Sequence, residues 1–318
     1  MFKKHLVILL SLFILILFSA CNDNDKNLSN SIISPRESKV KVSVSIDAMK
    51  EFVQAVGKDK VEISTIISTG ANTHDFEPKA QDILKISNSD IFVYNGLGME
   101  TWAEKAISAA NNPSLIVVDS SKDAEIIERK ETGESNDHKH EEDYSHSHGN
   151  YDPHLWLSLK GAQSQVKNIK DALIQANPSN KDYYEENYNK FIYQLEKLYN
   201  EYNIKFQSLE KNTLVSGHAA FAYLCRDFNL EQNSIRDVFA EGEPSAKQLA
   251  ELVEYCRDNN VKTIFSEDMV SPEVSETLAN EVGAKVEIIY TIEYPQGGMT
   301  YLERMESNLS KIYESLVE

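Results

Sequence analysis

Histidine is the side chain in this sequence that points most directly to chemistry, and its eight occurrences are unevenly spread. His5 directly precedes an apolar N-terminal run and is set aside. Four more share one segment that has no apolar periodicity: His138, His140, His146 and His148. The remaining three stand far apart in the chain: His74, His154 and His218. Neutral imidazole is a common metal ligand, so these three are the first candidates for a binding site.

Carboxylates that follow predicted strands extend this candidate set. His74 and His218 come after predicted strands, and His154 follows an extended Asp-Pro turn. Glu267 and Glu293 also follow predicted strand ends. In open α/β folds, ligands bind beyond the carboxyl ends of the strands. We therefore expect three imidazoles and one carboxylate to converge, and either glutamate fits as the fourth group.

Such a donor set suits zinc. Three neutral imidazoles and a carboxylate match the tetrahedral coordination of Zn²⁺, whereas Mn²⁺ favours more oxygen ligands. His218 is predicted to open a helix, whose positive N-terminal end would keep the ring neutral. Asp152 and Asp75 are candidate acceptors that would orient the imidazoles. Each histidine taken alone has a simpler interpretation as a structural residue, and no short motif such as His-Glu-x-x-His links the three.

Alternating strand and helix patterns supply the elements that must position these residues. They predict an α/β fold with two lobes, each a mostly parallel sheet flanked by helices, joined by one long backbone helix, with the metal site in the cleft between the lobes. The predicted strands are 40–46, 61–67, 91–95, 115–119, 213–216, 234–239, 261–266 and 285–290. The predicted helices are 48–56, 78–86, 99–110, 161–175, 180–209, 218–228, 246–258, 272–282 and 301–317.

The longest helical pattern, residues 180–209, divides the chain into its predicted domains. Apolar residues such as Tyr184, Phe191 and Leu195 recur there at steps of four and three, which gives one apolar stripe. A helix of that length would extend about 45 Å at about 1.5 Å per residue. The predicted domains are a signal peptide at 1–20, a lipid-anchored flexible tether at 21–38, an N-terminal α/β lobe at 39–179 with a His-rich loop at 131–150, a linking helix at 180–210, and a C-terminal α/β lobe at 211–318.

The N-terminus predicts export and a membrane anchor. Lys3 and Lys4 precede an apolar run over residues 6–18, which is short for a membrane span and fits a signal peptide. Small residues followed by Cys21 resemble a bacterial lipoprotein processing site, with the lipid on Cys21. Lipid chains there would hold the protein on the outer face of the cytoplasmic membrane.

Charge and cysteine content narrow the partners. The formal net charge of −18 argues against nucleic acid, which needs a basic binding surface. Beyond the N-terminal run, no stretch is long and apolar enough to span a membrane. Cys225 and Cys256 either form a disulfide or remain buried thiols, and the sequence leaves both open.

Five separated segments carry a resemblance to a known family. They are Thr73-His74-Asp75-Phe76-Glu77-Pro78, Gly96-Leu97-Gly98-Met99-Glu100-Thr101-Trp102, Asp152-Pro153-His154-Leu155-Trp156-Leu157-Ser158, Ser216-Gly217-His218 and Glu241-Gly242-Glu243-Pro244-Ser245. From about Lys39 to its end, the chain resembles the metal-specific solute-binding proteins of bacterial ABC importers, in the ZnuA/TroA-like cluster with a helical backbone between its lobes.

This resemblance implies that His74, His154 and His218 bind the metal. It implies Glu293 as the fourth ligand, with Glu267 or water as the alternatives. It favours zinc, because manganese-binding relatives often carry Glu where this chain has His218. The protein would then be an extracytoplasmic, high-affinity receptor that delivers Zn²⁺ to an ABC permease and its ATPase. It would act as a monomer and would have no enzyme activity.

Several alternatives stay open at this point. They are a manganese or iron receptor of the same class, an adhesin that uses the same fold, and a zinc hydrolase, which would need a general base at helical spacing to a ligand. The histidines of the loop 131–150 either hold extra zinc weakly and hand it to the main site, or accumulate it at the surface with little effect on uptake. Surface acids such as Glu100 and Glu241 are candidates for contact with the permease.

Overall fold

The computed structural model describes residues 38–129, 150–238, 244–268 and 271–318. Lys39–Glu318 forms one compact unit. Some residues singled out in the sequence lie outside the described ranges, namely Cys21, His138, His140, His146, His148 and Glu241. Among the described helices, none combines the length and the apolar character that crossing a bilayer requires.

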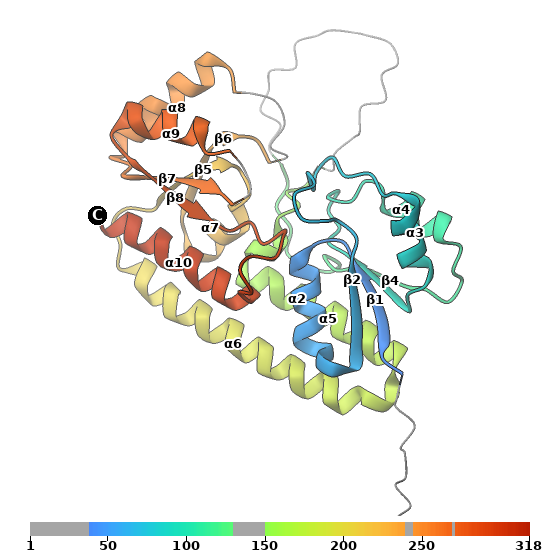
Figure 1. The fold of residues 1–318 in the computed structure, drawn as a ribbon. Helices are drawn as coiled ribbons and strands as arrows, with labels where there is room; N and C mark the ends of the chain where they lie inside the picture. The colour runs from blue at the N-terminus through green and yellow to red at the C-terminus, as the bar shows by residue number, and fades with distance from the viewer. Residues whose placement is uncertain (1–37, 130–149, 239–243, 269–270) are drawn as a thin grey trace, which may run out of the picture. The chain divides into compact units, whose positions relative to one another are not determined.

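The N-terminal sheet has four parallel strands in the order β2-β1-β3-β4 (Figure 1). The strands are β1 (Val40–Val44), β2 (Val61–Thr65), β3 (Ile91–Tyr94) and β4 (Ile116–Asp119). The helices around this sheet are α2 (Asp47–Gly57), α3 (Ala80–Ser87), α4 (Ala103–Ala110) and α5 (Leu159–Ala176), with short 3-10 turns η1 (Lys58–Lys60), η2 (Leu155–Leu157) and η3 (Pro178–Asn180). Helix α2 packs with α5, and α3 packs with α4. Since crossover helices cover a parallel sheet, the central strand β1 is largely buried.

The C-terminal sheet repeats this design with parallel strands in the order β6-β5-β7-β8. Its strands are β5 (Thr213–His218), β6 (Glu231–Arg236), β7 (Thr263–Glu267) and β8 (Lys285–Ile289). Its helices are α7 (Ala222–Phe228), α8 (Ala246–Asp258), α9 (Glu273–Val282) and α10 (Tyr301–Val317). Helices α8 and α9 pack together, and α9 lies against β7 and β8. The loops after β5, β7 and β8 leave the sheet at one common edge, because all its strands are parallel.

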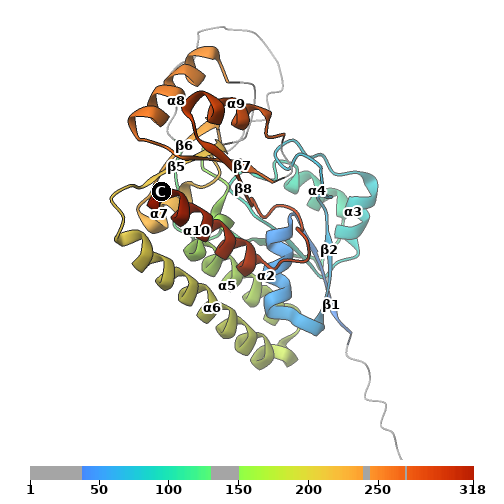
Figure 2. The same ribbon diagram turned by 60° about the vertical axis from the view of Figure 1, so that its left-hand side comes forward.

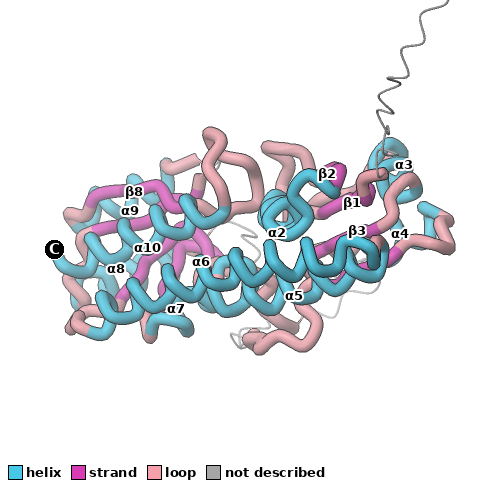
Figure 3. The backbone as a smooth tube through the Cα atoms, turned by 90° about the horizontal axis from the view of Figure 1, so that it is seen from below, coloured by secondary structure: helices cyan, strands magenta, loops and turns pink. Residues whose placement is uncertain are grey.

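Helix α6 (Lys181–Gln207) connects the two sheets and runs beside α2 and α5 at one end and α7 and α10 at the other (Figures 2 and 3). Its 27 residues correspond to about 40 Å. The buried residues of the predicted apolar stripe face the core: Tyr184, Phe191, Leu195, Leu198 and Tyr202. One hydrophobic cluster runs from β1 through α6 to α10. This continuous packing confirms the predicted fold class of two parallel sheets and one long backbone helix.

The structure corrects the predictions for His218 and Glu100, and it has β6 at Glu231–Arg236 where the sequence predicted a strand at 234–239. His218 is the last residue of β5, because its pairing with Arg236 of β6 extends the strand, and α7 begins only at Ala222. His218 therefore does not open a helix, so the proposed influence of a helix dipole on its ring is wrong. Glu100 was expected at the surface, but it is buried and accepts hydrogen bonds from the backbone N–H groups of Asn95 (2.9 Å) and Gly96 (3.0 Å).

Candidate metal centre

Four side chains from four separate segments meet in one buried cluster: His74, His154, His218 and Glu293. Each offers one ligand atom, and these atoms all lie within 4.8 Å of one another. The imidazole centroids are 5.3 to 6.1 Å apart. His74 lies in the loop after β2, and His154 directly precedes η2. His218 ends β5, and Glu293 lies in the loop after β8. Two ligand candidates therefore come from the N-terminal half of the fold and two from the C-terminal half.

His154 is held by one carboxylate. Asp152 Oδ1 accepts the backbone N–H of His154 at 2.8 Å and lies 2.9 Å from its Nδ1. Both side chains are almost fully buried. His154 Nε2 has no hydrogen-bond partner among the described residues, so it is the ring nitrogen left to bind a cation. Asp152 thus has the orienting position that the sequence suggested for it.

His218 has a similar partner in Glu267. The backbone N–H of His218 donates to Glu267 Oε1 at 2.8 Å, and the same oxygen lies 3.4 Å from His218 Nδ1. Burial alone would lower the pKa of His218, but the hydrogen bond to Glu267 and the charges of Glu267 and Glu293 outweigh it and raise the pKa. Glu267 therefore lies behind the imidazole, and it is not part of the four-residue cluster.

Glu293 reaches the cluster through an unusual turn. Ile292, fully buried, has a φ of 60°, a left-handed conformation that is rare for a β-branched residue. The backbone oxygen of Glu293 accepts the N–H of Asp47 at 3.0 Å. The hydroxyl of Thr73 donates to Glu293 Oε2 at 2.6 Å, and Thr73 precedes His74 directly. Glu293 is thus held at its backbone by Asp47 and at its carboxylate by Thr73.

Asp75 does not have the orienting position predicted for it. It is exposed, and its Oδ2 accepts a hydrogen bond from Asn72 Nδ2 at 2.6 Å. Asn72 Oδ1 in turn accepts the backbone N–H of His74 at 3.1 Å. Asp75 therefore stabilises the loop around His74 indirectly, through Asn72. It does not contact the imidazole through these bonds. Thr73 was missed as the partner of Glu293, although it stands first in the segment that carries the resemblance.

A cavity of about 260 Å³ adjoins the cluster. His74, His218 and Glu293 line it together with Arg236 and Asp268. The donor set of the cluster is three imidazoles and one carboxylate, which fits a borderline cation such as Zn²⁺ in tetrahedral coordination. Burial favours full replacement of the ion's water by protein donors, and deprotonated ligands are needed for that.

Comparison with known proteins identifies relatives over most of the chain. A family model described as zinc-uptake complex component A, periplasmic, matches residues 42–315. The chain is 43% identical over 279 residues to a putative metal-binding protein of Treponema pallidum, covering 87% of each. It is 35% identical over 325 residues to the high-affinity zinc uptake system protein ZnuA of Bacillus subtilis, covering 100% of this chain and 99% of that protein.

A solved structure shares the fold. The laminin-binding protein Lmb of Streptococcus agalactiae, described as a bifunctional protein with adhesin and metal transporting activity, superposes with a TM-score of 0.77. It is 32% identical in sequence, and the match covers 88% of this chain and 100% of that one.

Proposed function

This chain belongs to the family of zinc-uptake complex component A, and we propose that it binds Zn²⁺ outside the cytoplasm and delivers it to a membrane permease for import. The observation that carries the proposal is the buried cluster of His74, His154, His218 and Glu293. These residues are the metal ligands of the proposal, with Glu293 as the fourth. The name of the Bacillus subtilis relative supports zinc as the transported ion.

The donor types favour zinc over the other metals. Three imidazole nitrogens and one carboxylate oxygen complete a tetrahedral shell, whereas manganese would leave its preference for oxygen ligands unmet. Asp152 and Glu267 each lie beside Nδ1 of a ligand histidine, which holds the ring and directs Nε2 to the ion.

The same geometry favours a receptor over a hydrolase. A catalytic zinc keeps an open position for water, and four protein donors close that position. Glu293, at 7% exposure and hydrogen-bonded to Thr73, is the donor that would fill this position in the proposed site. A receptor for import is therefore the function that uses all four residues.

The partners are an ABC permease and its ATPase, and the receptor acts as a monomer. Lipid on Cys21 anchors it to the outer face of the cytoplasmic membrane. Adhesion is stated for the Streptococcus agalactiae protein, and it is not part of this proposal because no residue in the described ranges singles out an adhesive surface.

Calorimetric titration with Zn²⁺ and Mn²⁺ tests this function. The protein from Lys39 onward would be compared with His218→Ala, with Glu293→Gln and with a deletion of residues 134–149. We expect one tight Zn²⁺ site in the parent, weaker Mn²⁺ binding, and a large loss of Zn²⁺ affinity in His218→Ala. The exposed Glu306 supplies a matched control, since Glu306→Gln removes a similar charge from a residue that lines a groove beside α6 and not the cavity at the cluster.

The loop deletion separates the cluster from the His-rich segment. A tight site that survives the deletion belongs to the buried cluster, and weak additional binding that disappears belongs to the loop. If tight Zn²⁺ binding disappeared with the loop and persisted in His218→Ala, the proposed function of the cluster would be wrong.

A further inference from the structure

The loop that carries Glu293 crosses from β8 to α10 and is fastened to N-terminal residues. We define residues 290–300 as the ligand strap. Trp156 Nε1 donates to the backbone oxygen of Thr291 at 2.7 Å, and the N–H of Asp47 donates to the backbone oxygen of Glu293 at 3.0 Å. The strap follows the C-terminal sheet in sequence, yet its bonds place the fourth ligand against the N-terminal half of the fold.

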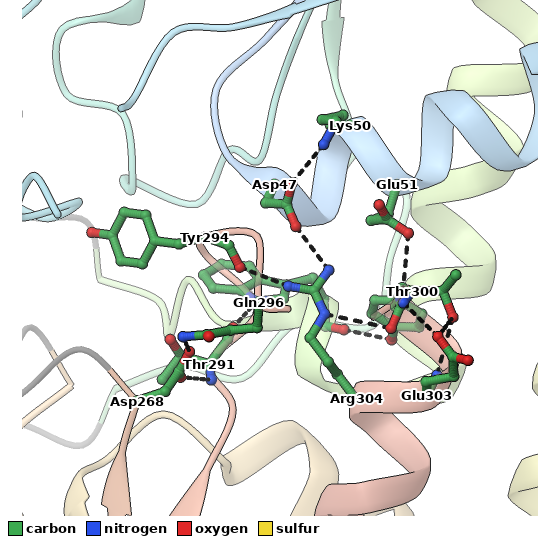
Figure 4. A network of polar contacts seen from close by, with 12 residues as sticks. Asp47, Lys50, Glu51, Asp268, Thr291, Tyr294, Gln296, Thr300, Glu303 and Arg304 are labelled. Atoms are coloured by element: carbon green, nitrogen blue, oxygen red, sulfur yellow. Dashed lines mark hydrogen bonds and ion pairs between the residues drawn. The ribbon is translucent and has the colours of Figure 1, made fainter. Parts of the chain in front are cut away.

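One buried cation completes this attachment. Arg304 in α10 is 0% exposed, and Figure 4 shows its guanidinium between the strap and α2. Its Nη2 donates to Asp47 Oδ2 at 2.8 Å, and its Nη1 donates to the backbone oxygen of Tyr294 at 2.7 Å. Its Nε lies 3.4 Å from the backbone oxygen of Thr300, at the other end of the strap. The guanidinium therefore contacts the strap at two points and α2 at a third.

Asp47 and Arg304 together hold two consecutive carbonyl groups. The Asp47 N–H donates to the carbonyl of Glu293, and the Arg304 guanidinium donates to the carbonyl of Tyr294. Because these carbonyls belong to the two peptide units on either side of the Tyr294 Cα, the pair fixes the backbone orientation at Tyr294, directly beside the ligand. Lys50 also contacts Asp47, at 3.2 Å, so this carboxylate is paired with two cations (Figure 4).

The buried ion pair between Asp47 and Arg304 has a role beyond its contribution to stability. A buried ion pair is often no more stabilising than apolar residues of the same volume, because both charges lose their water. Its planar, directional bonds are what apolar residues cannot supply. An aliphatic side chain at position 304 would fill the space but would leave the carbonyl of Tyr294 without its donor.

The strained backbone beside Glu293 shows why the strap needs such bonds. The left-handed φ of Ile292 is energetically costly for a β-branched residue, so it persists only where its surroundings enforce it. Thr73 secures the carboxylate of Glu293. Asp47 and Arg304 secure the backbone that follows Ile292, through the carbonyls of Glu293 and Tyr294. Release of the backbone would let Ile292 relax and would turn the carboxylate away from the imidazoles.

We propose that Arg304 and Asp47 are positioning residues that set the orientation of Glu293 in the metal site. This proposal rests on the proposed zinc function and deepens it. Neither residue touches the ion, and both act through the ligand strap. Loss of either should therefore weaken Zn²⁺ binding only as far as Glu293 contributes to it. Substitutions of residues that orient ligands typically weaken metal binding about 10- to 100-fold.

The test is a set of double-variant comparisons. Zn²⁺ dissociation constants would be measured by competition with a chelating dye for Arg304→Lys and Asp47→Asn, each alone and combined with Glu293→Gln. We expect each single variant to bind about 10- to 100-fold more weakly than the parent. In the Glu293→Gln background, the same substitutions should cost little further affinity, because the group they orient is already lost.

Matched measurements separate positioning from general damage. Arg257→Lys alters an exposed pair with Glu281 and should leave Zn²⁺ binding unchanged. Thermal unfolding of the metal-free variants reports whether the fold is retained. Asp47→Asn keeps the shape of the side chain and decides the matter if Arg304→Lys does not fold. Co²⁺ spectra of the single variants should match those of Glu293→Gln, since both lose the same ligand.

Three results would overturn the inference. Equal losses of affinity in the parent and Glu293→Gln backgrounds would show that the pair acts on the fold in general. Parent-like binding by folded Asp47→Asn would show that the pair does not control the ligand. If Glu293→Gln bound Zn²⁺ like the parent while His218→Ala did not, the inference would fail and the histidine site would stand. Tight binding by His218→Ala would instead remove the proposed function.

Discussion

Substitution of Gly217 by alanine should weaken zinc binding without touching a ligand. Gly217 precedes His218 on β5, and the space where its side chain would lie is taken by Glu267. A Cβ built at this position lies 3.0 Å from Glu267 Cδ and 3.1 Å from Oε1, and closer still to Oε2. Heavy atoms in contact normally stand roughly 3.5 Å apart, so the carboxylate must move away.

The structure gives the size of the effect. Glu267 Oε1 accepts the backbone N–H of His218 at 2.8 Å and lies 3.4 Å from its Nδ1. The contacts of Glu267 with the backbone N–H and with Nδ1 of His218 both weaken when the carboxylate moves away. The imidazole then loses the partner that orients it. A hydrogen bond to a charged group contributes about 1.5–3 kcal/mol. If the whole amount appears in binding, Gly217→Ala lowers the Zn²⁺ affinity roughly 10- to 150-fold, at about 1.4 kcal/mol per factor of ten.

The assay compares Gly217→Ala in two backgrounds. Zn²⁺ affinity would be measured by dye competition for Gly217→Ala, Glu267→Ala and the double variant. The double variant should bind like Glu267→Ala alone, because removal of the carboxylate makes room for the new methyl group. Parent-like binding by Gly217→Ala, or a further loss in the Glu267→Ala background, would refute the argument that Glu267 orients His218.

Three further predictions concern other parts of the fold. Burial raises the pKa of Glu100 to about 7, although the backbone hydrogen bonds to the carboxylate oppose this shift. The contribution of Glu100 to stability is therefore present below about pH 4.5 and is lost as the pH rises through about 7. In metal-free protein, the free energy of unfolding should therefore fall less between about pH 5 and pH 8 in Glu100→Gln than in the parent, and equal slopes would contradict this. Asp152→Asn removes the charge beside His154 and should weaken Zn²⁺ binding about tenfold with little change in the melting temperature, whereas unchanged affinity would exclude an orienting role. Cys225 and Cys256 are buried free thiols, and burial raises the pKa of Cys256 to about 11, so neither should react with a thiol reagent until the protein from Lys39 onward unfolds. Rapid labelling of the folded protein, with the denatured protein as the reference, would contradict their burial.

The sequence predicted the two sheets because parallel strands and their crossover helices alternate regularly along it. The backbone helix was predicted nearly to its ends, since its apolar stripe is long and regular. Helix starts were less accurate. The pattern after Ser216 is apolar enough for either structure, and only the pairing of His218 with Arg236 of the neighbouring strand decides that β5 continues. Such pairing depends on residues that are distant in sequence.

The candidate site shows the same limit. The rule that ligands lie beyond strand ends selected His74 and His218, but it left Glu267 and Glu293 equivalent. Glu267 is the last residue of β7 and faces the backbone of His218, whereas Glu293 enters the cluster only through the left-handed turn at Ile292. Isoleucine at position 292 does not predict a left-handed turn, because this conformation is rare for β-branched residues.

The partners of the ligand strap lay beyond local patterns for a similar reason. Arg304 lies on the same face of its helix as Tyr301, Met305 and Asn308, so a charge on a buried face was visible in the sequence. Its partner Asp47 is 257 residues away, and no spacing rule connects the two. Buried charges on apolar helix faces are therefore a signal that a long-range contact exists, without indicating where its partner is.

The separation of the four ligands along the chain also governs when the protein can acquire metal. Each of His74, His154, His218 and Glu293 belongs to a different segment, and only the finished fold brings them within 4.8 Å. An unfolded chain has no such site, because closing several long loops around one ion costs much more entropy than a short motif would. A chain threaded through a membrane before folding therefore carries no metal in this cluster. Export of such a receptor does not remove zinc through the cluster, and loading of the cluster starts only on the side where folding is completed.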